Sequence, residues 1–396
     1  MNKDKKNVSL LSACQGLLLT NNSILVATNA LAGFSLATNK SLATLPVTGY
    51  IIGAALTTFP ASLLMRKIGR RSGFILGALF GICGSLICGY AMYLHDFALL
   101  CVGTIVLGAY NAAGQYYRFA AADSVKFDFK SKAISLVLAG GIAGGILGPE
   151  TSKLTKDFFS TAAFLGSYLS LGVFCLLAIV VLSFVDIPPL TAAQKKEPGR
   201  PLSEIVRQPA YIVAVLSATI SYGVMNLLMT ATPLAMMACN YPFNDAAFVI
   251  QWHVVAMFGP SLFTGSLIGR FGVINVMLIG VALNVMCVAV ALAGVEVMNF
   301  WLAMVLLGVG WNFMFVGGTT LITECHAPSE RAKAQGANDQ AIFITMAATS
   351  VSSGLLFTLQ GWETMNRWAI PFLIVSAAAD LWLAARRRKA PRAVTR

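Results

Sequence analysis

Charged residues are scarce in this chain. Asp, Glu, Lys and Arg make up 11% of its 396 residues, whereas a soluble domain carries roughly 25%. Hydrophobic residues make up 57%, and the mean hydropathy is +0.75. Because so little charge cannot cover the surface of a water-soluble fold, the composition excludes a soluble globular protein and indicates a multi-pass membrane protein.

Groups of residues that would carry chemistry are also lacking. The three histidines do not cluster, and the eight cysteines form no C-x-x-C pair and lie mostly in apolar runs, as buried free thiols do. No nucleophile–base set, phosphate loop or metal cluster is recognisable, so we expect no cofactor, no metal and no enzymatic activity. The net charge of +12 lacks an aromatic-interleaved basic patch, so we expect no nucleic-acid partner.

Apolar runs long enough to cross a bilayer are abundant, since a span needs about 20 residues. We expect the first run to be a span and not a cleaved signal peptide, because Asn21, Asn22 and Ser23 interrupt it. The predicted spans are approximately 9–36, 42–65, 72–94, 97–122, 133–153, 161–185, 209–238, 246–269, 273–295, 299–323, 334–360 and 367–385.

The positive charges lie between these runs and at the two ends. The densest group is the short basic turn in PASLLMRKIGRRSGF, from Pro60 to Phe74, where Gly69 fits a tight helix-to-helix turn with a positive φ. If both termini are cytoplasmic, 24 of the 28 Lys and Arg residues fall on the cytoplasmic side, as the positive-inside rule requires. We therefore predict an inner-membrane protein with both termini in the cytoplasm, in contact with lipid and monomeric.

The two halves of the chain repeat one another weakly. A second basic turn, GSLIGRFG from Gly265 to Gly272, follows the first by about 200 residues, and KSKA from Lys130 corresponds to RAKA from Arg331. The longest polar stretch divides six runs from six. We predict an all-α membrane fold of two pseudo-symmetric six-helix bundles, 1–185 and 209–396, joined by a cytoplasmic linker, 186–208, and ending in a basic tail.

This arrangement resembles the major facilitator superfamily along essentially the whole chain. The family's loop pattern is G-x-x-x-D-R-x-G-R-R, which Lys67, Gly69, Arg70 and Arg71 match, while Arg66 stands where the family has an aspartate. The stretches SLATLP near Ser41 and TTFPASLLMR near Thr57 are similar to a bacterial subgroup that includes riboflavin and other small-metabolite permeases.

The fifth predicted span, AGGIAGGILGPE, resembles the glycine-rich motif of the superfamily's drug:proton antiporters. Small residues at this spacing let helices approach closely, and a proline allows a bend. Two interpretations are open, a hinge and close packing alone. The residues that we expect to act in gating are Arg66, Lys67, Gly69, Arg70, Arg71, Gly145, Gly148, Pro149 and Arg270.

The resemblance implies that spans one, four, seven and ten line a central cavity. Their polar and aromatic side chains are candidates because lipid-facing amides are costly. Amides and aromatics dominate, which favours a largely neutral, hydrogen-bonding and aromatic solute; helix–helix hydrogen bonding is the alternative for each amide. The candidates are Gln15, Asn22, Asn29, Asn111, Gln115, Arg118, Tyr222, Asn226, Trp311, Asn312, Phe315 and Thr319.

Charged side chains inside the spans are few. Arg118 has two interpretations, contact with an anionic part of the solute, or snorkelling and pairing with Asp123. We predict that Asp339 carries the coupling proton, with Glu150 as second choice. The alternatives are an ion pair of Asp339 with Arg331 or Lys333, and one of Glu150 with Lys153. Asp380 is expected to pair with Arg386 at the surface.

The function predicted from these observations is secondary active transport by alternating access. The solute is a small organic molecule, for which the permease resemblance suggests a vitamin such as riboflavin, and we expect coupling to protons. One alternative is efflux of drugs or siderophores by proton antiport, which the span-five motif favours. A second is a membrane receptor or scaffold that does not transport.

Overall fold

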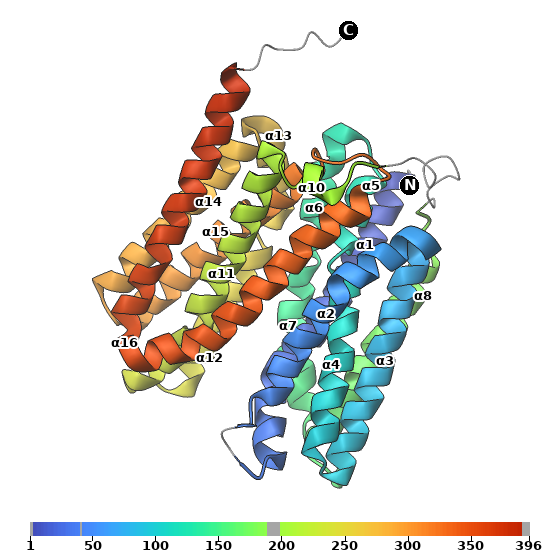
Figure 1. Cartoon of the computed structure of the whole chain (residues 1–396). Helices are drawn as coiled ribbons and strands as arrows, with labels where there is room; N and C mark the ends of the chain where they lie inside the picture. Colours follow the sequence, from blue (N-terminus) through green and yellow to red (C-terminus); the bar gives the residue numbers. More distant parts are fainter. Residues whose placement is uncertain (1–2, 40–41, 188–198, 390–396) are drawn as a thin grey trace. The chain divides into compact units, whose positions relative to one another are not determined.

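The computed structural model describes residues 3–39, 42–187 and 199–389, and in these ranges the chain forms helices and turns without a strand (Figure 1). Short turns join the helices, as expected for apolar segments that each satisfy their own backbone hydrogen bonds in lipid. The elements before the central linker are α1 (Lys3–Leu36), α2 (Leu45–Ile68), α3 (Arg70–Leu94), α4 (Phe97–Gly114), α5 (Tyr117–Asp123), the 3₁₀ turn η2 (Phe127–Phe129), α6 (Lys130–Ala139), α7 (Gly141–Thr155) and α8 (Leu165–Ser183).

The elements after the linker end in one long bent helix, α16, which runs through the last two predicted spans. Its backbone is non-helical at Gly361, where φ is 74° and ψ 177°. The elements are α10 (Leu202–Ile205), α11 (Pro209–Ala238), α12 (Phe243–Phe258), α13 (Ser261–Phe271), α14 (Val273–Ala293), α15 (Val297–Ile322) and α16 (Arg331–Lys389).

Several predicted spans are broken helices. Among the described residues, ten helices are long and apolar enough to cross a membrane, and α12 with α13 would make an eleventh, bent by 41°. The fourth predicted span breaks between α4 and α5, and the fifth breaks at Gly140 between α6 and α7. With the first part of α16, which runs through the eleventh predicted span, these helices form the twelve-helix, all-α membrane fold that the sequence predicted.

Contacts between residues divide the chain into two units. The first comprises Met1–Gly199 and Ala327–Ala347, and the second Arg200–His326 and Ala348–Arg396. The start of α16 belongs to the first unit because Ser62 Oγ donates to the carbonyl of Ala332 at 2.9 Å, and Phe343 packs with Ala54 and Ala112. The predicted boundaries at 185 and 209 followed chain order and remain a prediction; 188–198 of the linker and 390–396 of the tail lie outside the described residues.

The two basic turns share one backbone conformation. Gly69, between α2 and α3, has φ 89° and ψ 157°, and Gly272, between α13 and α14, has φ 85° and ψ 151°. A side chain would be strained at such a positive φ, so glycine is needed at both turns. This confirms the expectation that a positive φ at Gly69 would let two apolar helices join directly.

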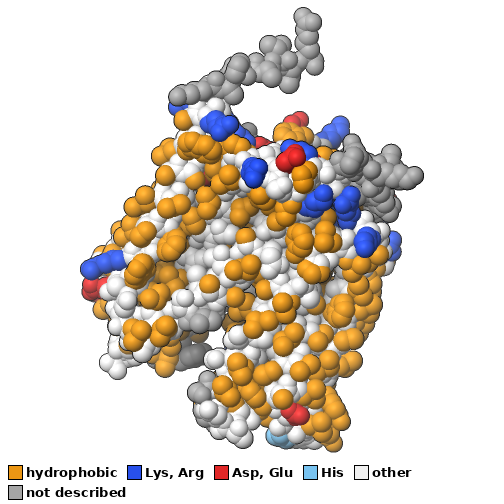
Figure 2. All heavy atoms as spheres, in the orientation of Figure 1, with side chains coloured by type: hydrophobic (Ala, Val, Ile, Leu, Met, Phe, Trp, Pro, Cys, Tyr) orange, Lys and Arg blue, Asp and Glu red, His pale blue; other side chains and the backbone are white. Residues whose placement is uncertain are grey.

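The outward-facing sides of the helices are apolar. Figure 2 shows hydrophobic side chains over much of the visible surface of the helices in each unit, with few charged groups among them. Val26 in α1 is 76% exposed and Leu154 in α7 is 78% exposed, fractions that an aqueous surface would not favour for large apolar residues. These faces suit contact with lipid chains.

Candidate functional site

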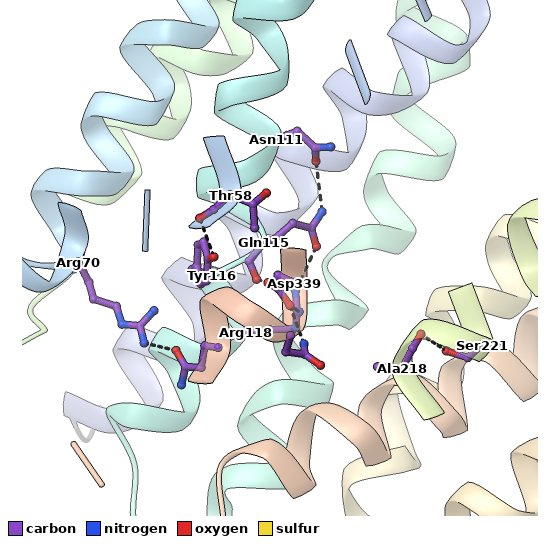
Figure 3. Close-up of polar contacts among 11 residues, drawn as sticks. Thr58, Arg70, Asn111, Gln115, Tyr116, Arg118, Ala218, Ser221 and Asp339 are labelled. Carbon is purple, nitrogen blue, oxygen red and sulfur yellow. Dashed lines mark hydrogen bonds and ion pairs between the residues drawn. The ribbon is translucent and has the colours of Figure 1, made fainter. Parts of the chain in front are cut away.

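A continuous chain of hydrogen bonds crosses the first unit. The Tyr50 hydroxyl of α2 donates to Oδ1 of Asn22 in α1, and Nδ2 of Asn22 donates to Oδ1 of Asn111 in α4 at 3.2 Å. Nε2 of Gln115 donates to the same Asn111 oxygen, also at 3.2 Å (Figure 3). Three of the predicted solute-binding residues are thereby brought together, with Tyr50 as a member that the prediction did not name.

The chain continues from Gln115 to a buried ion pair (Figure 3). Nη1 of Arg118 donates to the carbonyl of Gln115 at 2.6 Å and to its Oε1 at 3.1 Å, and Nη2 lies 2.5 Å from Oδ1 of Asp339 in α16. Nδ2 of Asn338 donates to the same carboxylate oxygen at 2.8 Å. The side chains of Arg118 and Asp339 are each only 2% exposed, so this charge pair is shielded from water.

The break between α4 and α5 positions these groups. α4 ends at Gly114, and Gln115 and Tyr116 form the turn before α5 begins at Tyr117. Tyr116 fixes the turn, because its hydroxyl donates to the carbonyl of Thr58 in α2 at 2.8 Å. The Arg118 guanidinium lies 4.6 Å from the centre of the Phe119 ring, a cation–π contact that helps to hold its orientation.

The ion pairs differ from the alternatives that the sequence suggested. Arg118 was considered as a partner of Asp123, and Asp339 as a partner of Arg331 or Lys333. In the structure Arg118 pairs with Asp339, while Oδ2 of Asp123 lies 2.6 Å from Arg70 and 3.1 Å from Arg331. Asp123 thus supplies the carboxylate that the first basic turn lacks where the family pattern has an aspartate.

The basic turn is further tied to α16 within the first unit. Arg70 Nη2 donates to Oε1 of Gln335 at 2.6 Å. The Arg70 side chain is half-buried, whereas Lys67 and Arg71 are exposed. Arg270 of the second turn is also exposed. The predicted gating residues therefore do not form one group: Arg70 bonds to α5 and α16, and the exposed cations lie at the surface.

The glycines of α7 pack against α1. A Cβ added at Gly148 would lie 2.3 Å from Cβ of Ser23, and one at Gly144 would lie 2.6 Å from the backbone carbon of Leu19. These distances leave room only for hydrogen, so Gly144 and Gly148 account for the close approach of the helices. Gly145 is half-buried, and Pro149 lies inside α7.

The other two candidate amides of α1, Gln15 and Asn29, lie outside this chain of hydrogen bonds. Asn29 accepts a hydrogen bond from the Tyr168 hydroxyl of α8 at 2.9 Å, so it links two helices, as the alternative for each amide described. Gln15 is buried, with 3% of its surface exposed. Asn22 and Asn29 are seven residues apart and so lie on one face of α1, but of these two only Asn22 joins the chain that leads to Arg118.

The other acids lie in contrasting surroundings. Glu150 is exposed and lies 2.8 Å from Lys153, the surface ion pair that was its alternative interpretation. The prediction for Asp380 is wrong: its side chain is 0% exposed, and neither carboxylate oxygen has a hydrogen-bond partner in the part of the chain that the structure describes. Arg386 is six residues further along the helix, which places its side chain about 120° away from Asp380 around the helix axis.

Aromatic rings form a cluster in the second unit. Tyr222 of α11 meets Trp311 and Phe315 of α15 edge-on, with ring centres 5.1 and 4.9 Å apart. Trp311 and Phe315 are stacked at 4.9 Å, and Phe258 of α12 contacts Trp311 at 5.6 Å. Phe258 was not foreseen. We call Tyr222, Phe258, Trp311 and Phe315 the aromatic cluster.

Two polar atoms in the second half of α15 lack hydrogen-bond partners among the described residues. Nε1 of Trp311 and Oγ1 of Thr319 are buried and make no hydrogen bond within the described residues. Buried donors of this kind carry a free-energy cost unless a partner is supplied. Because Trp311, Phe315 and Thr319 follow one another at four-residue spacing, they lie along one side of α15.

The amides of the second unit form structural hydrogen bonds. Asn312 donates to the carbonyl of Met257 at 2.7 Å and to Oγ of Ser261 at 2.5 Å, and accepts from Thr264 at 2.7 Å. It therefore holds α15 to the junction of α12 and α13. Asn226 donates to Oγ1 of Thr349 at 3.0 Å, which joins α11 to α16.

The loop after α15 is held at the predicted cytoplasmic end of the second unit. Arg200 and Gln208 donate to the carbonyl of Cys325 at 3.2 and 2.8 Å, and Arg387 lies 2.7 Å from Glu324. Burial raises the pKa of the Cys325 thiol to about 12, so this cysteine stays protonated and unreactive near neutral pH.

Within the described residues there is no group of three or more His, Cys, Asp or Glu arranged for a metal.

Comparison with known proteins identifies the family. The family model described as Major Facilitator Superfamily matches residues 11–261 and 253–396. The chain therefore belongs to the Major Facilitator Superfamily and is a multi-pass membrane transporter. It is 41% identical over 375 residues, 93% of each chain, to the riboflavin transporter RfnT of Brucella anthropi. It is also 28% identical to the MFS-type transporter YddS of Bacillus subtilis over 84% of this chain and 80% of that one.

Solved structures share the fold at low sequence identity. The human organic anion transporter MFSD10 is 10% identical, with a TM-score of 0.78 and coverage of 96% of this chain and 100% of that one. The fucose:proton symporter FucP of E. coli, as its N162A variant, is 16% identical, with a TM-score of 0.69 and coverage of 94% and 98%. At such identities the likeness concerns the fold alone.

Proposed function

We propose that this transporter moves riboflavin, or a solute with the same ring system, across the inner membrane by alternating access, coupled to protons. The observation that carries the proposal is the 41% identity, along 93% of both chains, to a riboflavin transporter. Relatives at this identity over their full length commonly keep the site that recognises the solute, and its side chains should then suit a flavin.

The side chains of both units suit such a solute. Riboflavin is neutral near pH 7 and combines a flat aromatic ring system with a chain of hydroxyl groups. The aromatic cluster offers faces and edges for ring stacking, and Trp311 Nε1 offers a donor for a ring carbonyl. Asn22, Asn111 and Gln115 offer amide groups that both donate and accept, as hydroxyl groups require.

Proton coupling is supported by the chain of hydrogen bonds in the first unit. Asp339 binds Arg118 as a carboxylate, through a charge-assisted bond of 2.5 Å. Protonation would remove that charge, so Arg118 would be free to change its bonds to Gln115, and the change would reach Asn111 and Asn22. We infer that uptake of a proton at Asp339 alters the amides that bind solute. Glu150, exposed beside Lys153, has weaker support.

The proposed topology follows from charge. We propose that both termini and the linker lie in the cytoplasm, and that the protein works as a monomer in the lipid bilayer. The distribution of Lys and Arg supports the cytoplasmic placement, because cytoplasmic loops carry the excess of positive charge.

The test is counterflow in liposomes that contain the purified chain. Vesicles loaded with unlabelled riboflavin should take up external labelled riboflavin transiently, in the absence of any ion gradient. Replacing the loaded riboflavin by an unrelated drug or siderophore tests the efflux alternative. Riboflavin that binds without counterflow would indicate a receptor, and folded protein that neither binds nor exchanges riboflavin would refute the proposal.

A substitution that removes only the indole donor tests the aromatic cluster. Trp311→Phe keeps a ring but deletes the N–H group, so we expect riboflavin affinity to fall roughly 2–12-fold, the equivalent of one hydrogen bond. Trp301→Phe is the matched control, since Trp301 lies on the same helix beside Trp252, 6.3 Å away, and outside the aromatic cluster. Equal affinities for the two variants would contradict a role for Trp311 Nε1.

A further inference from the structure

Asp380 lies on the buried face of the last transmembrane segment. The buried residues of this part of α16 recur every three or four positions, as on one side of a helix. Asp380 is the acidic residue among them, and its side chain is 0% exposed. The buried face consists of Trp362, Met365, Asn366, Ala369, Leu373, Ser376, Asp380 and Leu383.

The Asp380 carboxyl group makes no polar contact with the described residues. Both of its oxygens are buried without a hydrogen-bond partner, and no described cation lies within 4.0 Å. Oγ of Ser376, one turn earlier on the same face, is also buried without a partner. Two polar groups one turn apart on this face are therefore left without hydrogen-bond partners among the described residues.

The helices of the second unit offer almost no charge to compensate Asp380. α11, α14 and α15 contain no Asp, Glu, His, Lys or Arg, and their titratable groups are Tyr211, Tyr222 and Cys287. The charged or titratable residues of α12 are Asp245 and His253, and that of α13 is Arg270.

Three charged residues at the two ends of this segment are paired elsewhere, and Arg386 and Arg388 are exposed. Trp362 Nε1 donates to the carbonyl of Ala291 at 3.1 Å, which fixes the start of the segment against α14. Arg387 binds Glu324 at 2.7 Å near its end. Glu363 and Arg367 pair with one another at 3.2 Å and are exposed. The segment is thus anchored at both ends while Asp380 lies in an apolar section between them.

An ionised carboxylate in this position would be far less stable than the neutral acid, since an isolated buried charge has neither water nor a counter-ion to stabilise it. We propose that Asp380 is a proton-binding site of the second unit, separate from the Arg118–Asp339 pair of the first. Its carboxylate takes up one proton to form the carboxylic acid and returns that proton to water when the segment is exposed during turnover. Ser376 offers a hydroxyl oxygen on the same face for the acid proton.

Infrared spectroscopy of the purified full chain decides whether the proton is bound. At pH 7, the spectrum of the wild-type chain minus that of Asp380→Asn should contain the carbonyl stretch of a protonated carboxylic acid. The matched control is Glu363→Gln, which should remove a carboxylate band because Glu363 is exposed and ion-paired. If Asp380→Asn also removes a carboxylate band, Asp380 is ionised and the proposal is wrong.

A transport measurement decides whether the proton is exchanged. Asp380→Asn should keep counterflow, which needs no proton movement, and should weaken the dependence of net transport on an imposed pH gradient by at least about half if it is one of two proton sites. Unchanged gradient dependence would overturn the exchange step. The infrared test needs no solute, so its outcome is independent of whether riboflavin is the substrate.

Discussion

The buried pair of Arg118 and Asp339 allows a prediction in which two substitutions do less harm than one. Arg118→Met removes the cation and leaves the Asp339 carboxylate, only 2% exposed, without its counter-ion. Breaking a buried pair in this way costs about 3–5 kcal/mol of unfolding free energy. Asp339→Leu strands the guanidinium and should cost a similar amount.

The double variant Arg118→Met with Asp339→Leu removes both charges together. Replacing a whole buried pair by apolar residues is often neutral or stabilising, but the Gln115 oxygens would still lose the donor that lies 2.6 Å from the carbonyl. That loss should cost about 1–3 kcal/mol. We therefore expect the double variant to be about 2 kcal/mol more stable than Arg118→Met alone.

The assay is reversible denaturant unfolding of the detergent-solubilised chain, followed by circular dichroism. The control cycle uses Glu363 and Arg367, an exposed pair at i and i+4, for which a coupling of only about 0.3–0.5 kcal/mol is expected. A double variant at 118 and 339 that is less stable than both single variants would refute the reasoning, because no stranded charge would then explain the losses.

Four other predictions concern packing, backbone strain, coupling and topology. Gly148→Leu should lower stability by about 1–3 kcal/mol through overpacking between α1 and α7, and an unchanged melting temperature would contradict this. Gly69→Ala should cost about 1–3 kcal/mol from its positive φ, whereas Gly269→Ala in α13, with nothing near its added Cβ, should not destabilise. Gln115→Leu interrupts the chain of hydrogen bonds and also removes a solute-binding amide, so pH-gradient-driven transport should fall more than counterflow does; equal loss of both would argue against a coupling role. A cysteine in place of Thr191 should react with an impermeant thiol reagent only from the cytoplasmic side, and labelling from outside would overturn the predicted topology.

The sequence predicted the features that depend on local composition. Run length and charge placement predicted the spans, and the glycine in the first basic turn predicted the positive φ at Gly69. These features follow from hydrophobicity and backbone sterics over a few residues. The breaks after Gly114 and at Gly140 lie inside continuous apolar runs, so hydropathy carries no signal for them.

The candidate site was only partly predictable because its contacts join distant segments. Asn22, Asn111, Gln115, Arg118 and Asp339 were all named as candidates, yet the hydrogen bonds among them depend on how four helices pack. Tyr50 had no signal, since its span was not expected to line the cavity. The predicted pair of Asp380 and Arg386 could have been rejected, because side chains six residues apart point about 120° away from one another around a helix.

The place of Asp339 in the first unit has a consequence for biosynthesis. Arg118 and Asp339 are 221 residues apart in sequence, and a chain grows at about 5–20 residues per second, so Arg118 is made roughly 10–45 seconds before its partner. Through that interval the first unit has an arginine in an apolar region and lacks the start of α16. Its folding is therefore completed only after most of the second unit has been synthesised, and a chain stopped short of residue 339 should be an early target for membrane quality control.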